Sequence, residues 1–147
     1  MAVPTGSGTE TLHSHFFEDV DATQTLIYGA QHHVYTVLSV IVYCEALNAT
    51  TDFGYLQMKT YDNHSASGTG STMILARFNP QAGETYAWNE KFSFNGYEPS
   101  GTAVLSAAVQ ILNAAQGGSA VAELKFDMTS ASDDYDVGIT YIDQDFS

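Results

Sequence analysis

Two pairs of histidines come nearest, by residue type and spacing, to a metal site. His13 and His15 stand two positions apart, and His32 and His33 open an apolar stretch. Two imidazoles at i and i+2 lie on one face of a strand and can share Zn²⁺, whose third and fourth ligands would come from other residues or a second chain. Polar residues at a strand edge give the same pattern without a metal. Both interpretations stay open, so we assign no metal ligand and expect no cofactor.

Carboxylates are the most numerous titratable groups, and they gather in short runs. These runs are Glu18-Asp19-Asp21, Asp133-Asp134-Asp136, and Asp143 with Asp145. Glycoside hydrolysis needs two carboxyl groups at a fixed separation across a cleft, and the calcium pattern D-x-[DN]-x-[DN]-G is not matched. Solvated loops are the commoner origin of such runs. We therefore predict no catalytic carboxylate, and at most weak Ca²⁺ binding at residues 133–136.

The sequence contains no motif for a catalytic nucleophile or for phosphate binding. The G-x-S-x-G pattern is absent, and Gly68-Thr69-Gly70 lacks the lysine and the following helix of a phosphate loop. Cys44 is the only cysteine and lies in an apolar stretch, so we expect a buried thiol and no internal disulfide. The sequence predicts that the protein is not an enzyme.

Aromatic side chains alternate through residues 86–94. Tyr86, Trp88, Phe92 and Phe94 would share one face of a strand. Such a row can stack on sugars, but aromatics at alternate strand positions more often belong to the core. We favour the core for most of this row, and keep a carbohydrate-binding module as the less favoured interpretation.

Strand-like stretches recur along the chain with turn residues between them. Eight of them predict an all-β, antiparallel β-sandwich, jelly-roll-like, with about eight to nine strands. The stretches are 10–17, 24–28, 34–44, 53–61, 71–78, 84–94, 120–128 and 136–142.

Three details of this organisation are less uniform. The turn at residues 79–83 predicts a hairpin that joins 71–78 to 84–94. Residues 102–115 fit helical spacing and strand alternation equally well, and the all-β context favours a strand. Residues 1–9 are predicted to be a flexible N-terminal arm, ahead of a single domain at 10–147.

Two of the predicted strands differ in their faces. In 120–128 the even positions are apolar and Glu123, Lys125 and Asp127 alternate with them, which predicts one buried and one wet face. In 34–44 both faces are apolar. A sandwich core covers only one face of a strand, so a loop or a neighbouring subunit must cover the other, and we favour a subunit. The predicted interface residues are Tyr35, Val37, Ile41, Tyr43, Tyr86 and Trp88.

The charge balance excludes two classes of partner. Seventeen carboxylates face only four lysines and arginines, so the formal net charge is −13. Binding to a nucleic-acid backbone needs clustered lysine and arginine, and an anionic membrane surface attracts the same residues. We expect neither nucleic acid nor membrane as a partner. Charged residues make up only 14% of the chain, so the surface is poorly defended against protein association.

Several segments resemble the capsid decoration, or cement, proteins of tailed bacteriophages. They are the strand Val37-Leu-Ser-Val-Ile-Val42, the turn ending at Ala82-Gly83, the stretch Thr85-Tyr-Ala-Trp-Asn-Glu-Lys-Phe92 and the closing Thr140-Tyr-Ile-Asp-Gln-Asp145. The resemblance implies a β-sandwich, commonly a homotrimer, that docks on the outside of the capsid. Its partner would be the major capsid protein, and its location the virion exterior.

Three functions of different kinds follow. The favoured one is a decoration protein that stabilises the capsid shell by subunit contacts. The second is another virion component, such as a tail, neck or fibre-base protein, which a lower copy number per particle would reveal. The third is the carbohydrate-binding module, for which loss of glycan binding in Trp88→Ala would be needed.

Overall fold

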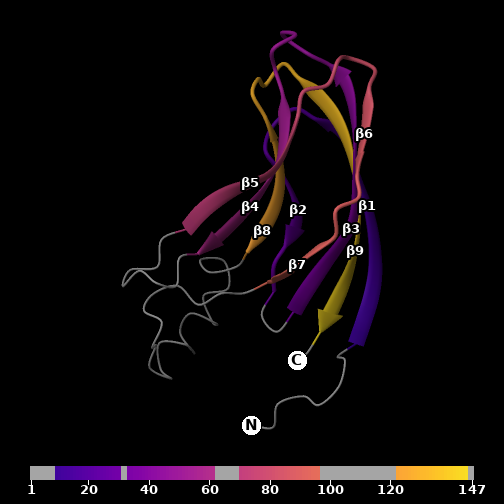
Figure 1. Ribbon diagram of the computed structural model, residues 1–147, viewed down its shortest axis with the longest axis vertical. Helices are drawn as coiled ribbons and strands as arrows, with labels where there is room; N and C mark the ends of the chain where they lie inside the picture. Colours follow the sequence, from indigo (N-terminus) through magenta and orange to yellow (C-terminus); the bar gives the residue numbers. More distant parts are fainter. Residues whose placement is uncertain (1–8, 31–32, 62–69, 97–121, 146–147) are drawn as a thin grey trace.

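The computed structural model describes residues 9–30, 33–61, 70–96 and 122–145, which form nine strands (Figure 1). Within these ranges no helix is long and apolar enough to cross a membrane. The strands are β1 (Thr9–Val20), β2 (Gln24–Tyr28), β3 (His33–Ala46), β4 (Gly54–Tyr61), β5 (Gly70–Phe78), β6 (Thr85–Trp88), β7 (Phe92–Asn95), β8 (Glu123–Met128) and β9 (Asp134–Asp145).

The strands form two facing antiparallel sheets, which confirms the predicted sandwich. The five-stranded sheet A has the order β1-β9-β3, with β6 and β7 both pairing along the far edge of β3. The four-stranded sheet B has the order β2-β8-β4-β5. Since β6 and β7 follow one another along β3, they act as a single interrupted strand. Apart from the step from β4 to β5, which stays in sheet B, the chain then alternates between the sheets as a jelly roll does.

Large side chains from both sheets fill the space between them. β9 contributes Tyr135, Val137 and Ile139, and sheet B contributes Leu56 and Phe126, all essentially inaccessible to solvent. Burial of this apolar surface drives the two sheets together, at roughly 25 cal/mol per Å² removed from water. The core therefore supplies a rigid base for whatever the outer faces of the sheets do.

The predicted alternation of residues 120–128 is confirmed in β8. Leu124, Phe126 and Met128 lie in the core, and Lys125 points away from it. Glu123 is less exposed than the pattern indicates. Its Oε2 lies 3.4 Å from Nζ of Lys125 and 3.9 Å from Nζ of Lys59, so the carboxylate is covered by its ion-pair partners.

β3 departs from simple alternation because of a β-bulge. The register against β9 shifts between Val37 and Ser39. Before the bulge the odd positions Tyr35 and Val37 point into the core, and after it the even positions, such as Val40, do so. The extra residue of a bulge exchanges the faces of the strand. The two apolar faces in the sequence are therefore largely one core face, read on either side of this shift.

The predicted hairpin between 71–78 and 84–94 is wrong. β5 is an edge strand of sheet B, whereas β6 belongs to sheet A, so the turn at 79–83 crosses from one sheet to the other. Gly83, at φ +90°, donates its N–H to the carbonyl of Cys44 (2.7 Å), and the N–H of Cys44 bonds the carbonyl of Glu84 (2.9 Å). These bonds attach the chain to β3 before β6 begins.

Some predictions fall outside the described residues. The segment 102–115 lies there, as does His32. The predicted N-terminal arm also lies outside them, except for Thr9, with which β1 begins.

Candidate docking face

The outer surface of sheet A carries an apolar centre, which we call the docking face. It comprises the side chains that β1, β3, β6, β7 and β9 turn away from sheet B. One row across the sheet pairs Phe16 with Gly138, Gly138 with Ile41, and Ile41 with Ala87. Leu12 and Ile142 stand in a second row. Phe16 and Ile41 thus flank a glycine, and a Cβ added there would meet nothing closer than the backbone oxygen of His15 at 4.0 Å, so we describe the open space between the two apolar side chains as a hollow.

The exposure of these side chains is unusually high for residues of their kind. Leu12 is 66% exposed, Phe16 64%, Ile41 48% and Tyr43 37%. Single exposed hydrophobic residues are normal on protein surfaces. Here they stand on β1 and β3, on either side of β9, whose Ile142 lies on the same face, and groups of exposed apolar side chains on one face mark interaction sites.

The polar side chains within the docking face bond to each other across the strands. The hydroxyls of Ser14 and Thr140 lie 2.9 Å apart, and those of Thr36 and Ser93 lie 2.8 Å apart. A hydroxyl pair that is already bonded loses less when water leaves than an unpaired one. The polar part of the face can therefore be covered at low cost.

The charges of sheet A all have one sign. None of its five strands contains a lysine or an arginine. The four cations of the chain lie elsewhere: Lys59, Arg77 and Lys125 are in sheet B, and Lys91 lies between β6 and β7. The carboxylates of sheet A are Glu10, Glu18, Asp19, Glu45, Asp134, Asp136, Asp143 and Asp145.

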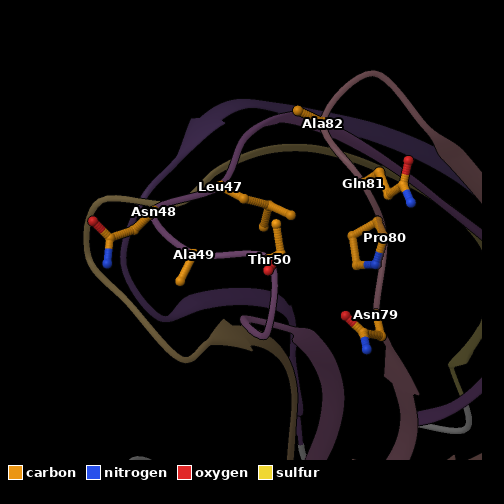
Figure 2. A pocket seen from close by; sticks show the side chains of 8 residues that line it. All are labelled: Leu47, Asn48, Ala49, Thr50, Asn79, Pro80, Gln81 and Ala82. Carbon is orange, nitrogen blue, oxygen red and sulfur yellow. The ribbon is translucent and has the colours of Figure 1, made fainter.

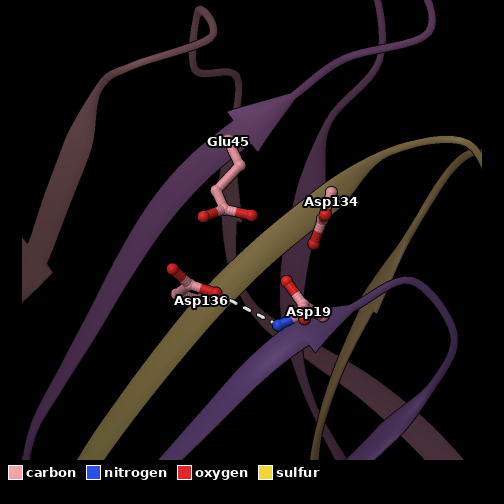
Figure 3. A group of neighbouring side chains, drawn as sticks. All are labelled: Asp19, Glu45, Asp134 and Asp136. Atoms are coloured by element: carbon pink, nitrogen blue, oxygen red, sulfur yellow. Dashed lines mark hydrogen bonds between the residues drawn. The ribbon is translucent and has the colours of Figure 1, made fainter.

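Four of these carboxylates converge at the end of the docking face next to Tyr43 (Figure 3). Asp19, Glu45, Asp134 and Asp136 each offer an oxygen, and these oxygens all lie within 4.8 Å of one another. Asp19 has a positive φ of 51°, a conformation that aspartate tolerates better than most residues, and its N–H donates to Oδ1 of Asp136 (3.1 Å). The β-bulge of β1 between Phe17 and Val20 places Asp19 there. We call this group the acidic cluster.

Desolvation and mutual repulsion both raise pKa values in the acidic cluster. Burial, followed by the negative charges of Asp136 and Asp134, raises the pKa of Glu45. Burial and the charge of Asp19 raise the pKa of Asp134, whose Oδ1 is inaccessible and has no hydrogen-bond partner. Oxygen clusters of this kind attract hard cations, ammonium groups or guanidinium groups. A positive charge brought to the cluster would relieve the repulsion.

Only part of the predicted interface lies on the docking face. Ile41 and Tyr43 point outward and belong to it. Tyr35 and Val37 do not, since the bulge turns them into the core, where burial raises the pKa of Tyr35 to about 12. This corrects their expected exposure.

Tyr86 and Trp88 lie on the inner face of sheet A, half-buried against the core. The ring of Trp88 packs against that of Phe92, with centroids 5.5 Å apart. The Tyr86 hydroxyl donates to Oε2 of Glu84 at 3.1 Å. The aromatic row is therefore mainly part of the core, as the alternation indicated.

The histidines are held by protein groups. His13 and His15 stack on each other, with centroids 5.7 Å apart, and Nε2 of His15 lies 3.3 Å from the hydroxyl of Tyr141. Nδ1 of His33 lies 2.7 Å from Oδ1 of Asp143, which ties the start of β3 to the end of β9. Each of the three described histidines thus contacts other side chains of the chain.

A buried polar group closes the end of the sandwich below the loop at residues 47–53. Oδ1 of Asp133 accepts the N–H of Asn48 (2.8 Å), but Oδ2 has no hydrogen-bond partner. Burial and the neighbouring Asp52 raise the pKa of Asp133. The hydroxyl of Tyr135 is also buried without a partner, and burial raises its pKa as well. Burial raises the pKa of the Cys44 thiol, which makes it a poor nucleophile.

A pocket of about 620 Å³ lies between two loops at the same end (Figure 2). Residues 47–50 line one side and residues 79–82 the other. The lining side chains are amides, one hydroxyl and apolar groups. They include no carboxylate, imidazole or thiol, so the pocket offers no general acid or base.

Sequence reasoning missed Leu12 and Phe16, which are more exposed than Ile41 and Tyr43 of the same face. Their alternation with His13 and His15 was visible, but the side on which they lie depends on the pairing of β1 with β9. The acidic cluster was missed for the same reason. Its carboxylates were noted as separate runs, and only the pairing of the first and last strands brings Asp19 to Asp136.

Comparison with known proteins gives distant structural similarity only. Similar chains occur in structures of the infectious bursal disease virus Gx strain (TM-score 0.38, 8% identity, 95% of this chain and 38% of that chain). Others occur in the T13 viral particle of that virus (TM-score 0.39, 8% identity, 95% and 36%) and in T=1 particles derived from it (TM-score 0.38, 8% identity, 99% and 38%). The chain thus spans less than two fifths of the length of those chains. At this TM-score the similarity assigns neither a family nor a function.

No protein-family model matches the sequence, and no curated protein matches it.

Proposed function

We propose that this chain is a virion structural protein of a tailed bacteriophage, which binds the outside of the capsid shell and stabilises it without catalysis. The observation that carries the proposal is the exposed apolar centre of the docking face, with Leu12 and Phe16 on β1 and Ile41 and Tyr43 on β3, the two strands that flank β9. A jelly roll with such a face suits a protein that works by contact. The resemblance to decoration proteins supplies the major capsid protein as the partner.

The physical basis of the stabilisation is burial of surface across a junction between shell subunits. Covering the docking face removes apolar area from water on both partners, and each subunit pair that is bridged gains this free energy only while it stays together. Stable attachment needs about 1,600 Å² of total buried area. A homotrimer, as the resemblance implies, would multiply the contacts of one copy without new chemistry.

Two matched substitutions test this function. Phe16→Ser removes an apolar side chain from the docking face, and Met73→Ser removes one of similar exposure (58%) from β5 of sheet B. We expect Phe16→Ser to weaken binding to purified capsid shells by at least about tenfold, because it lies in the contact. Met73→Ser should bind as the unmodified protein does. Co-sedimentation with shells that lack the protein measures both.

The thermal stability of the shells tests the stabilising role separately from binding. Shells with the unmodified protein bound should release their contents at a higher temperature than bare shells, and shells mixed with Phe16→Ser should behave as bare shells. Equal melting of bare and saturated shells would contradict stabilisation. Binding at a few dozen copies or fewer would instead favour the tail, neck or fibre-base alternative.

A further inference from the structure

The two sheets of the sandwich differ sharply in charge. Sheet B holds lysines that are paired with a carboxylate of its own, such as Lys125 with Glu123. Sheet A has eight carboxylates in its strands and no lysine or arginine. The apolar centre of the docking face therefore lies between Glu10 at one end of β1 and the acidic cluster at the other, and the cation at the edge of this sheet is Lys91, between β6 and β7.

We propose that the partner surface covering the docking face has an apolar projection ringed by lysine and arginine side chains. The proposal rests on the function proposed above and specifies the chemistry of the partner. The apolar projection fits the hollow over Gly138, between Phe16 and Ile41. The basic ring meets the carboxylates that surround this centre.

Charge decides against a second copy of this chain as the occupant. Two docking faces brought together would place carboxylates of one copy against carboxylates of the other, with no lysine or arginine in the strands of either sheet A to separate them. Like charges across an interface suppress association, whereas complementary potentials accelerate it. Any trimer of this chain would therefore form through another surface.

Within the docking face, we expect a basic side chain of the partner to bind most strongly at the acidic cluster. Its four carboxylate oxygens lie within 4.8 Å of one another, and desolvation together with repulsion raises the pKa of Glu45 and Asp134. A guanidinium group binds two carboxylate oxygens at once in a planar geometry. Tyr43 is paired with Asp136 on the neighbouring strand, so an arginine seated in the cluster would stand beside the apolar centre.

The first experiment uses synthetic peptides as probes of this chemistry. One is an amphipathic leucine–lysine peptide, and the other has the same leucines with glutamate in place of lysine. The leucine–lysine peptide should bind the protein, and its affinity should fall about tenfold between 50 and 300 mM salt, since screening weakens charge attraction. The leucine–glutamate peptide should not bind. Phe16→Ser should weaken binding of the basic peptide, and Met73→Ser should not.

The second experiment removes charge without changing shape. The double variant Glu45→Gln/Asp136→Asn neutralises half of the acidic cluster while keeping an oxygen to accept the N–H of Asp19. The control Glu90→Gln/Asp127→Asn removes the same charge from outside the docking face, since Glu90 lies between β6 and β7 and Asp127 lies in β8. We expect the first to weaken binding to capsid shells and to the basic peptide roughly tenfold, and the control to leave both unchanged.

The outcomes separate this inference from the proposed function. If shell binding changes neither with salt nor in the Glu45→Gln/Asp136→Asn variant, the proposed basic ring on the partner is contradicted, and the capsid role is not. Salt-dependent binding of the basic peptide with no binding to shells supports the partner chemistry and contradicts the capsid role. A dimer in solution that dissociates in Phe16→Ser overturns the inference, because the occupant would then be a second copy.

Discussion

Gly138 and Gly29 differ in how much space surrounds the position that a side chain would occupy. An ideal Cβ at Gly138 meets nothing closer than the backbone oxygen of His15 at 4.0 Å, so the position is open toward the docking face. At Gly29 the same atom would lie 2.1 Å from the carbonyl oxygen of Gly96 and 2.5 Å from that of Ala122. Gly29 permits backbones to approach, whereas Gly138 leaves a hollow.

This contrast predicts opposite effects of substitution. Gly138→Val should keep or slightly raise the stability, by about 0.5 kcal/mol, because valine suits a strand and restricts the unfolded chain. It should also weaken shell binding by filling the hollow. Gly29→Ala should cost about 3 kcal/mol or more, because backbone must move. Urea unfolding and co-sedimentation measure both; a Gly138→Val variant that binds normally would contradict the hollow as a contact.

Asp133 makes the stability of the folded protein depend on pH. Its folded pKa is raised, chiefly by burial, so the folded protein holds this proton more tightly than the unfolded chain. The contribution of Asp133 to the free energy of unfolding is therefore fully present below the ordinary aspartate pKa of about 4. It is lost as the pH rises through the raised folded pKa.

Asp133→Asn keeps the acceptor for the N–H of Asn48 and removes the charge. We expect it to stabilise the protein at pH 7 by about 1 kcal/mol and to flatten the pH profile between pH 4 and neutrality. Urea unfolding at several pH values measures this. An unchanged slope would show that Asp133 is not the group responsible.

At the scale of single elements, β8 and β3 mark what a sequence can and cannot predict. β8 alternates without interruption, so its core face, with Leu124 and Phe126, followed directly from the order of residues. In β3 the bulge after Val37 contains no glycine or proline to announce it. The bulge is fixed by pairing with β9, which lies about a hundred residues away in the chain. The assignment of Tyr35 and Val37 to an outer face failed for this reason.

Trp88 distinguishes the structural role of β6 from a sugar-binding one. It is half-buried against Phe92 and the core, so Trp88→Ala should destabilise the protein by about 2 to 3 kcal/mol. The control Tyr28→Ala removes an aromatic side chain that is 62% exposed, and should cost less than about 0.5 kcal/mol. Thermal or urea unfolding compares the two. Equal stability of the two variants would contradict the packing role of Trp88.

At the scale of the whole molecule, fold class and docking face were predictable to different degrees. The spacing of the strand-like stretches predicted the sandwich. The residue count alone showed that the protein has few lysines and arginines. The segregation of charge between the sheets was not visible, because it depends on which strands pair. Ile41 and Tyr43 were identified from the apolar pattern of one strand, whereas Leu12 and Phe16 join them only through the neighbouring pairs β1–β9 and β9–β3.

The central claim is that another protein covers the outer face of sheet A. Covalent footprinting of the protein, free and bound to capsid shells, tests it most directly, with mass spectrometry reporting the labelling of each side chain. The account predicts that Leu12, Phe16, Ile41 and Tyr43 lose their labelling on binding, while Met73 and Ile74 of β5 keep theirs. Protection of Met73 and Ile74, with Phe16 labelled as strongly as in the free protein, would contradict it.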